Sequence, residues 1–120
     1  MNEPKKIVYP YKKEYPLADT ESAVFEVEII SSATTATTSI LTPTATRPVK
    51  ITDNASLNIG TGKSLRGTTY ISSILSCPVA AIENIEVNYK INGHVLVPHS
   101  NPTSEQDRPR VDIAIHFVEP

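Results

Sequence analysis

Residues 85–97 read IEVNYKINGHVLV, and this stretch decides the fold. From residue 85 to residue 91, apolar side chains alternate with polar ones, which is the period of a strand with one buried face. Asn92-Gly93 then supplies the dipeptide favoured in a two-residue type I′ turn. The chain returns as a second strand, and this turn places Leu96 opposite Tyr89 on the apolar face. The stretch therefore predicts a β-hairpin with one face in a core.

Further strands are predicted on both sides of this hairpin. The same alternation runs through residues 23–31 and 110–118, while residues 67–76 are rich in β-formers and carry few charges. The chain holds 13 Ile, 10 Val and 13 Thr, whose branched side chains suit a pleated surface better than a helix. Seven to nine short strands at a spacing of about ten residues predict an all-β, antiparallel β-sandwich or small barrel.

The chain length of 120 residues suits a single domain. Residues 1–16 contain three prolines and three tyrosines, and they are interpreted as an extended N-terminal arm in which residues 7–9 could form a short edge strand. Residues 17–120 then form the sandwich. An arm with Tyr9, Tyr11 and Tyr15 suits docking on a protein surface, because a tyrosine buries a large ring and keeps its hydroxyl wet. The alternative is a frayed terminus.

Two segments leave alternatives open. Residues 31–48 hold seven threonines and are either a hairpin with Thr-rich faces or a mobile loop. Residues 98–109 contain three prolines and are predicted to form a long polar loop. Such a loop is either a recognition surface or a connector. As a recognition surface it offers His99, Asn101, Asp107 and Arg108.

The motifs of catalysis and cofactor binding are missing or incomplete in the sequence. Gly60-Thr61-Gly62-Lys63-Ser64 resembles a phosphate loop but lacks the earlier glycine and the following helix, so it is interpreted as a hairpin loop. The three histidines share no ligand spacing, which predicts no metal site. Cys77 is the single cysteine and is interpreted as a buried structural thiol, and residues 78–83 as one helical turn. We expect no enzyme activity and no cofactor.

The charge balance narrows the class of partner. The formal net charge is −2, which gives no general attraction to nucleic acid or to an anionic membrane surface. No apolar run is long enough to cross a membrane, and the first residues lack the apolar region of a secretory signal, so a cytoplasmic location is expected.

The sequence is compatible with two functions. The first is a non-enzymatic protein-interaction or assembly module, with another protein or a second copy of the chain as partner. The second is a small carbohydrate-binding, lectin-like domain, in which tyrosines would stack on sugar rings. The candidate binding residues are Tyr9, Tyr11, Tyr15, His99, Asn101, Asp107 and Arg108.

Overall fold

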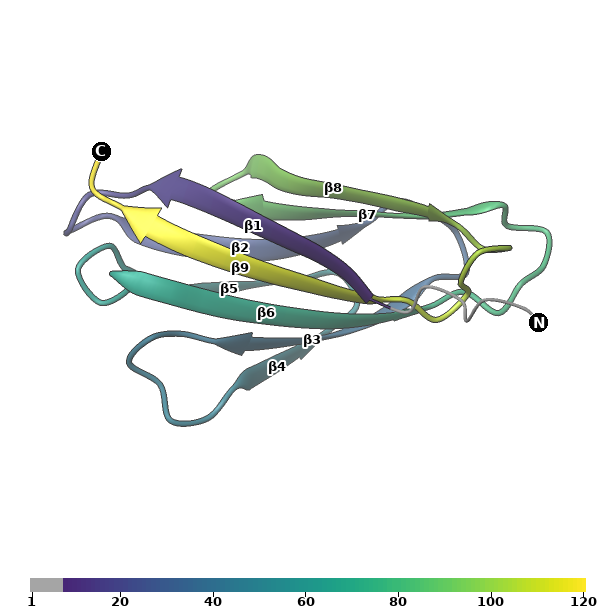
Figure 1. Cartoon of the computed structure of the whole chain (residues 1–120), viewed down its shortest axis with the longest axis horizontal. Coiled ribbons are helices and arrows are strands. Elements are labelled where there is room, and N and C mark those ends of the chain that lie inside the picture. Colours follow the sequence, from purple (N-terminus) through teal and green to yellow (C-terminus); the bar gives the residue numbers. More distant parts are fainter. Residues whose placement is uncertain (1–7) are drawn as a thin grey trace, which may run out of the picture.

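A computed structural model describes residues 8–120 as two β-sheets packed face to face (Figure 1). The five-stranded sheet has the order β1-β9-β6-β3-β4, and the four-stranded sheet has the order β5-β2-β7-β8. No residue in this described part is helical. The predicted all-β sandwich is confirmed. The nine strands are β1 (Val8–Pro16), β2 (Ser22–Ile29), β3 (Thr35–Leu41), β4 (Val49–Thr52), β5 (Ala55–Thr61), β6 (Gly67–Ser76), β7 (Asn84–Ile91), β8 (His94–Pro102) and β9 (Arg110–Val118).

The core lies between the sheets and is built from the alternating apolar positions of the strands. The predicted inward set of β9 is buried. Opposite it, Phe25 of β2 stacks on Tyr89 of β7 with the ring centroids 6.2 Å apart. A buried hydrogen bond of 2.9 Å joins the hydroxyls of Thr38 and Ser73. Branched aliphatic side chains fill most of the remaining interior, as the composition predicts.

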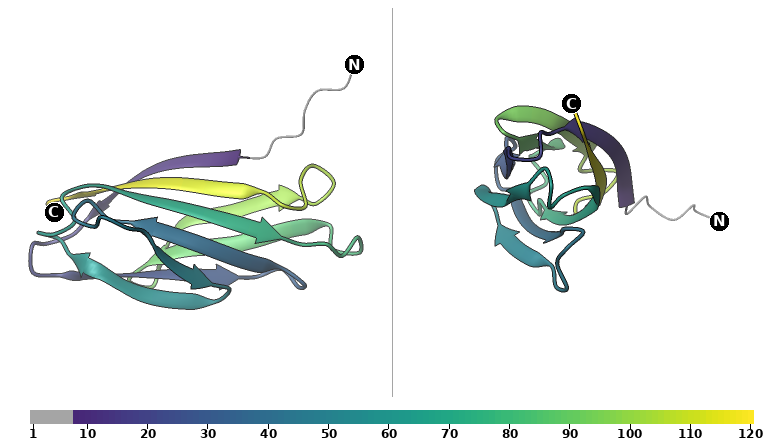
Figure 2. Two further views of the ribbon diagram at one scale, coloured as in Figure 1. Left: turned by 90° about the horizontal axis from the view of Figure 1, so that it is seen from below. Right: turned by 90° about the vertical axis from the view of Figure 1, so that its left-hand side faces the viewer.

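The first and last strands lie side by side. β1 pairs with β9 in parallel, from Val8 opposite Arg110 to Pro16 opposite Val118, and among the described strands every other pair is antiparallel. Residues 8–16 of the predicted arm are therefore the edge strand of the five-stranded sheet. The start of β1 and the end of β9 lie at opposite ends of the elongated body (Figure 2). Residues 1–7 lie outside the described part.

The prolines of β1 occupy its free edge. The N–H of Leu17, directly after β1, donates to the carbonyl of Val118 at 2.9 Å. Successive N–H groups of a strand point to opposite edges, so the odd-numbered residues of β1 face β9 and the even-numbered ones face outward. Pro10 and Pro16 are even-numbered, so the donors that they lack are not needed by the ladder.

The hairpin register differs from the prediction. Asn92 and Gly93 do form the turn, with φ of 50° and 80°. A bulge at Tyr89/Lys90 shifts the pairing by one residue, so Tyr89 lies opposite Val97 instead of Leu96. Val97 is consequently the fully buried residue. A bulge adds one residue to one strand and is not visible in an alternating pattern.

The predicted loop of residues 98–109 is wrong in its first part. β8 continues through Pro98 to Pro102, and the loop is limited to residues 103–109. Proline is tolerated here because β8 is an edge strand. The alternation therefore carries His99 and Asn101 inward, where both are buried.

Three other segments are settled. Residues 31–48 supply only the first strand and the loop of a hairpin, because β3 pairs with β4, which begins just beyond this segment at Val49. The Gly60–Ser64 segment does not close a hairpin, because β5 and β6 belong to different sheets. Gly62 is needed there, since a Cβ on it would lie 2.1 Å from the carbonyl oxygen of Ala18. Residues 78–83 form a turn and not a helical turn.

The direction of the N–H groups in β1 can be tested with two neighbouring proline substitutions. Lys13→Pro removes a donor that faces β9, and we expect it to lower the free energy of unfolding by roughly 1–3 kcal/mol, the cost of an acceptor left without its donor. Glu14→Pro is the matched control, because its N–H faces the free edge. Urea unfolding of both variants measures the difference. Equal losses would contradict the assigned edge.

The turn glycine supplies a second test. A Cβ on Gly93 meets no atom within 4 Å, so Gly93→Ala carries only the strain of a positive φ, roughly 1–2 kcal/mol. Asn92→Gly should lower the stability of the fold more than the turn sequence alone suggests. The Asn92 side chain accepts from the N–H of Val24 and donates to the carbonyl of Ser22, and the variant loses both hydrogen bonds. Thermal unfolding should show clear losses for both variants, and Glu86→Ala on the same sheet should change little.

Candidate functional site

The outer face of the five-stranded sheet is hollowed along β9. One hollow of about 530 Å³ extends from Arg110 to Ala114, and a second of about 450 Å³ continues from Ala114 to His116. Both are lined by Lys12, Ala114 and Tyr70, so they join into one trough. We call this surface the β9 trough. At the rise per residue of a strand, the six steps from Arg110 to His116 span about 20 Å.

The strand register creates the trough. Lys12, Ala114 and Tyr70 lie in one row across β1, β9 and β6. Neighbouring strands lie about 4.8 Å apart, which puts the backbones of Lys12 and Tyr70 roughly 10 Å from each other. Ala114 lies between two long side chains and leaves the space above β9 open. In the neighbouring row across the sheet, the small side chains of Ser72 and Ser39 leave space above β6 and β3 in the same way.

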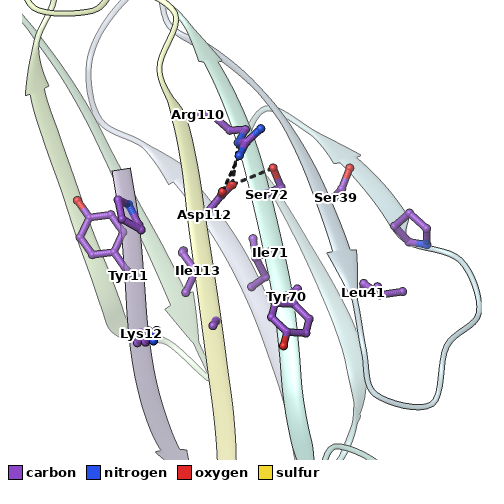
Figure 3. A pocket seen from close by; sticks show the side chains of 13 residues that line it. Tyr11, Lys12, Ser39, Leu41, Tyr70, Ile71, Ser72, Arg110, Asp112 and Ile113 are labelled. Atoms are coloured by element: carbon purple, nitrogen blue, oxygen red, sulfur yellow. Dashed lines mark hydrogen bonds and ion pairs between the residues drawn. The ribbon is translucent and has the colours of Figure 1, made fainter. Parts of the chain in front are cut away.

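A fixed polar group lies at one end of the trough (Figure 3). The guanidinium of Arg110 donates to both oxygens of Asp112, at 3.1 and 2.9 Å, and the hydroxyl of Ser72 donates to the same carboxylate at 3.1 Å. A carboxylate has about four lone-pair sites, so one acceptor position remains on Asp112. The planar guanidinium is held in one orientation with its remaining N–H groups available.

Tyr70 supplies an aromatic surface beside this group. The residue is 58% exposed, and Leu41 of β3 is its partner on the side away from β9. Figure 3 shows Tyr70 on β6 and Lys12 on the opposite wall. The trough thus combines an exposed aromatic ring, fixed hydrogen-bond donors and acceptors, and the ammonium group of Lys12.

Four of the candidate residues predicted from the sequence meet elsewhere, between the edges of β1 and β8. The Tyr11 hydroxyl and the His99 Nδ1 are 2.8 Å apart, and the His99 Nε2 is 2.8 Å from the Asn101 Oδ1. The ring of Tyr9 packs edge-on against His99 at 5.0 Å, and the Tyr9 hydroxyl donates to the Glu105 carboxylate. His99 and Asn101 are each 2% exposed, so this group closes the interior.

The tautomer of His99 follows from its partners. The amide nitrogen of Asn101 donates to the carbonyls of Pro102 and Gln106, which assigns the other side-chain atom as the acceptor oxygen. His99 Nε2 therefore carries the hydrogen, and Nδ1 accepts the Tyr11 O–H. Burial lowers the pKa of His99, although its bond to Asn101 opposes this shift. Burial therefore favours the neutral imidazole, in which Nδ1 accepts from the Tyr11 hydroxyl.

Burial also shifts the pKa values of two tyrosines of β1. Burial and, to a smaller extent, the hydrogen bond to Glu105 raise the pKa of Tyr9 to about 12, and burial raises the pKa of Tyr11. Both phenols therefore stay protonated and act as donors. Their hydrogen bonds hold β1 against β8 and the loop that follows it.

The other three predicted residues lie apart from this group. Tyr15 packs edge-on against Phe117, with ring centroids 6.1 Å apart. Asp107 and Arg108 are exposed in the loop of residues 103–109, where the Asp107 carbonyl accepts from the N–H of Cys77. Cys77 is buried, as expected. The binding role of all seven residues stays a prediction.

The outer face of the four-stranded sheet has a different character. Glu28 forms an ion pair of 3.1 Å with Lys90 and accepts from Asn88 at 3.1 Å. The hydrogen bond from Asn88 and, after it, the one from Lys90 lower the pKa of the Glu28 carboxyl.

Within residues 8–120, His, Cys, Asp and Glu form no group of three that could hold a metal ion. No helix of the described chain has the length and apolar character needed to cross a membrane.

The trough residues were not among those selected from the sequence. The alternation in residues 67–76 does put Tyr70 and Ser72 on the same face, but the trough depends on which residues of β1, β9 and β6 meet. Comparison of the chain with protein-family models, with curated proteins and with solved structures finds no match.

The His99 group predicts a pH dependence of stability. Because the pKa of His99 is lower in the folded chain, the unfolded chain binds more protons below about pH 6.5, the ordinary value for histidine. The free energy of unfolding should be fully retained above that pH and should fall as the pH decreases toward the folded pKa. The slope approaches at most about 1.4 kcal/mol per pH unit for one proton. Urea unfolding between pH 7.5 and 5 measures it.

The matched variant for this measurement is His99→Gln, which retains a donor and an acceptor but does not titrate. We expect its stability curve to be flatter than that of the wild-type protein over the same pH range. The exposed His94 and His116 remain in both proteins. Parallel curves for the two proteins would show that His99 does not cause the dependence.

Proposed function

We propose that the protein is a non-enzymatic binding module that holds a carbohydrate, specifically a linear oligosaccharide, in the β9 trough. The observation that carries this proposal is the row in which Ala114 leaves an open space between Tyr70 and Lys12. The trough extends for about 20 Å along one strand. Its length and shallow shape suit an extended chain better than a compact small molecule.

The chemistry of the lining supports a sugar. The weakly polar C–H face of a sugar ring packs on an aromatic ring, and Tyr70 presents such a ring to solvent. Sugar hydroxyls both donate and accept, and the Arg110–Asp112 pair offers fixed donors beside one remaining acceptor position. A rigid pair of this kind loses little entropy when a ligand binds.

The trough supports binding better than catalysis. Asp112 is the carboxylate at one end of the trough, and its oxygens already accept three hydrogen bonds from Arg110 and Ser72. These bonds occupy three of its roughly four acceptor positions, which leaves little of the carboxylate free for a reacting group. We therefore propose no chemical step for the bound ligand.

A protein-interaction or assembly module is the second candidate. Ile74 is 56% exposed on the same face of β6 as Tyr70, about 13 Å further along the strand. Exposed apolar side chains on one face suit a protein partner. Pairing through the free edge of β1 has weaker support, because Pro10 and Pro16 remove donors from that edge. A protein partner would therefore dock on the sheet face.

The carbohydrate proposal can be tested with an array of immobilised linear oligosaccharides, followed by calorimetric titration with the strongest binder. We expect Tyr70→Ala to weaken binding at least tenfold through loss of stacking. Ala114→Gln should also weaken it, because a longer side chain fills the trough. Ile74→Ala is the matched control, since it removes an exposed apolar side chain from the same strand outside the trough lining.

Two outcomes would contradict the carbohydrate proposal. One is the absence of any reproducible glycan on the array. The other is equal loss of binding in Tyr70→Ala and Ile74→Ala. A stable oligomer in light scattering that becomes monomeric on Tyr70→Ala, together with a blank array, would instead support the assembly candidate.

A further inference from the structure

The parallel pairing of β1 and β9 has a mechanical consequence that is independent of any ligand. The register is unbroken over nine residue pairs, from Val8–Arg110 to Pro16–Val118. At the rise of a strand, this ladder is about 30 Å long. Because the two strands run in the same direction, the chain enters β1 at one end of the body and leaves β9 at the other (Figures 1 and 2).

A pull between these two points acts along the strands. It therefore loads the hydrogen bonds of the ladder in shear, and the evenly spaced bonds of a parallel pair share the load. A pull between two points at the same end of the ladder acts across it and breaks the bonds one after another. The first geometry requires many bonds to fail together, so it presents the higher barrier to forced unfolding.

Both ends of β1 carry additional attachments. Near the start, the Tyr9 hydroxyl bonds to Glu105 in the loop after β8, and Tyr11 bonds to His99 of β8 itself, which ties β1 to the opposite sheet. Just beyond its end, Leu17 is fully buried, and its carbonyl accepts from Arg66 at 2.6 Å. These contacts prevent either end of the strand from fraying ahead of the ladder.

The other partner of β9 is equally well fixed. On its second edge, β9 pairs with β6 over eight residue pairs, and four side chains of β9 are buried in the core. A force that reaches β9 is therefore passed to the centre of the sandwich. The ladder that lies directly between the two points of pulling is therefore the one between β1 and β9.

We propose that this protein bears tension: the β1–β9 pair is a shear clamp that resists a pull applied between the start of β1 and the end of β9. The function that this adds is a mechanical link between whatever is attached at the two ends of the sandwich. The clamp depends on the topology and on the β1 contacts, and it does not depend on the β9 trough or its ligand.

Single-molecule force spectroscopy can compare the two loading directions in the same chain. One handle is attached at the N-terminus in both cases. The second is attached through an exposed cysteine, either Glu119→Cys beyond the end of β9 or Arg108→Cys beside the start of β1. Cys77 is buried and does not compete for the handle.

We expect the Glu119→Cys protein to unfold at a force several-fold higher than the Arg108→Cys protein at the same pulling speed. Both substitutions are at exposed positions, so the folded state is the same and only the direction of loading differs. Equal forces, or a higher force for Arg108→Cys, would overturn the proposal.

A second comparison assigns the resistance to the ladder. In the Glu119→Cys background, Lys13→Pro removes a donor that faces β9 and should lower the unfolding force. Glu14→Pro, whose N–H faces the free edge, should leave the force nearly unchanged. Equal forces for these two variants would assign the resistance to another part of the fold and overturn the clamp. If Lys13→Pro does not fold, the comparison of the two handle positions still decides the proposal.

Discussion

The parallel ladder between β1 and β9 is the constraint on which the rest of the structure depends. It fixes which residues of β1 point inward and which point outward, because both side chains and N–H groups alternate along a strand. Odd-numbered positions place Tyr9 and Tyr11 over the opening between the sheets, where they meet His99. Even-numbered positions place Pro10 and Lys12 on the outer face. A shift of one residue would exchange these two sets.

The interior and the outer face of this sheet are therefore built by the same register. The inward row from Tyr11 through Ile113 to Ile71 is apolar except for one hydroxyl, which finds a buried acceptor in His99. The neighbouring outward row from Lys12 through Ala114 to Tyr70 is uneven in height and produces the trough. A small residue at position 114 costs the core nothing, because its side chain faces away from it.

Much of the fold could be predicted from the sequence because strand alternation is a local signal. It identifies the inward face of β9 and the Asn92-Gly93 turn correctly. The pairing of distant strands is not local, so nothing in residues 8–16 indicates that β1 joins β9 in parallel. The bulge at Tyr89/Lys90 was missed for a related reason, since one extra residue leaves the apolar pattern nearly unchanged.

The candidate site was harder to predict than the fold. His99 and Asn101 were selected as loop residues because prolines surround them, yet an edge strand accepts proline and takes both side chains into the interior. They are important to the structure for their hydrogen bonds to each other and to Tyr11. The trough was not predictable at all, since Tyr70, Ala114 and Lys12 are far apart in the sequence. The register between β1 and β9 and the register between β6 and β9 bring them into one row.

The two proposals meet in β9. This strand forms the floor of the trough and is also one half of the proposed clamp. A ligand that contacts Lys12 and Tyr70 at once would touch β1 and β6, the two neighbours of β9, and would connect them across its outer face. Such a ligand binds only the folded arrangement, because the row of residues that it contacts exists only when both ladders are intact. By mass action it would stabilise these ladders against separation. Binding on the outer face and resistance to tension along the strands are thus compatible in one sheet, and the first would reinforce the second.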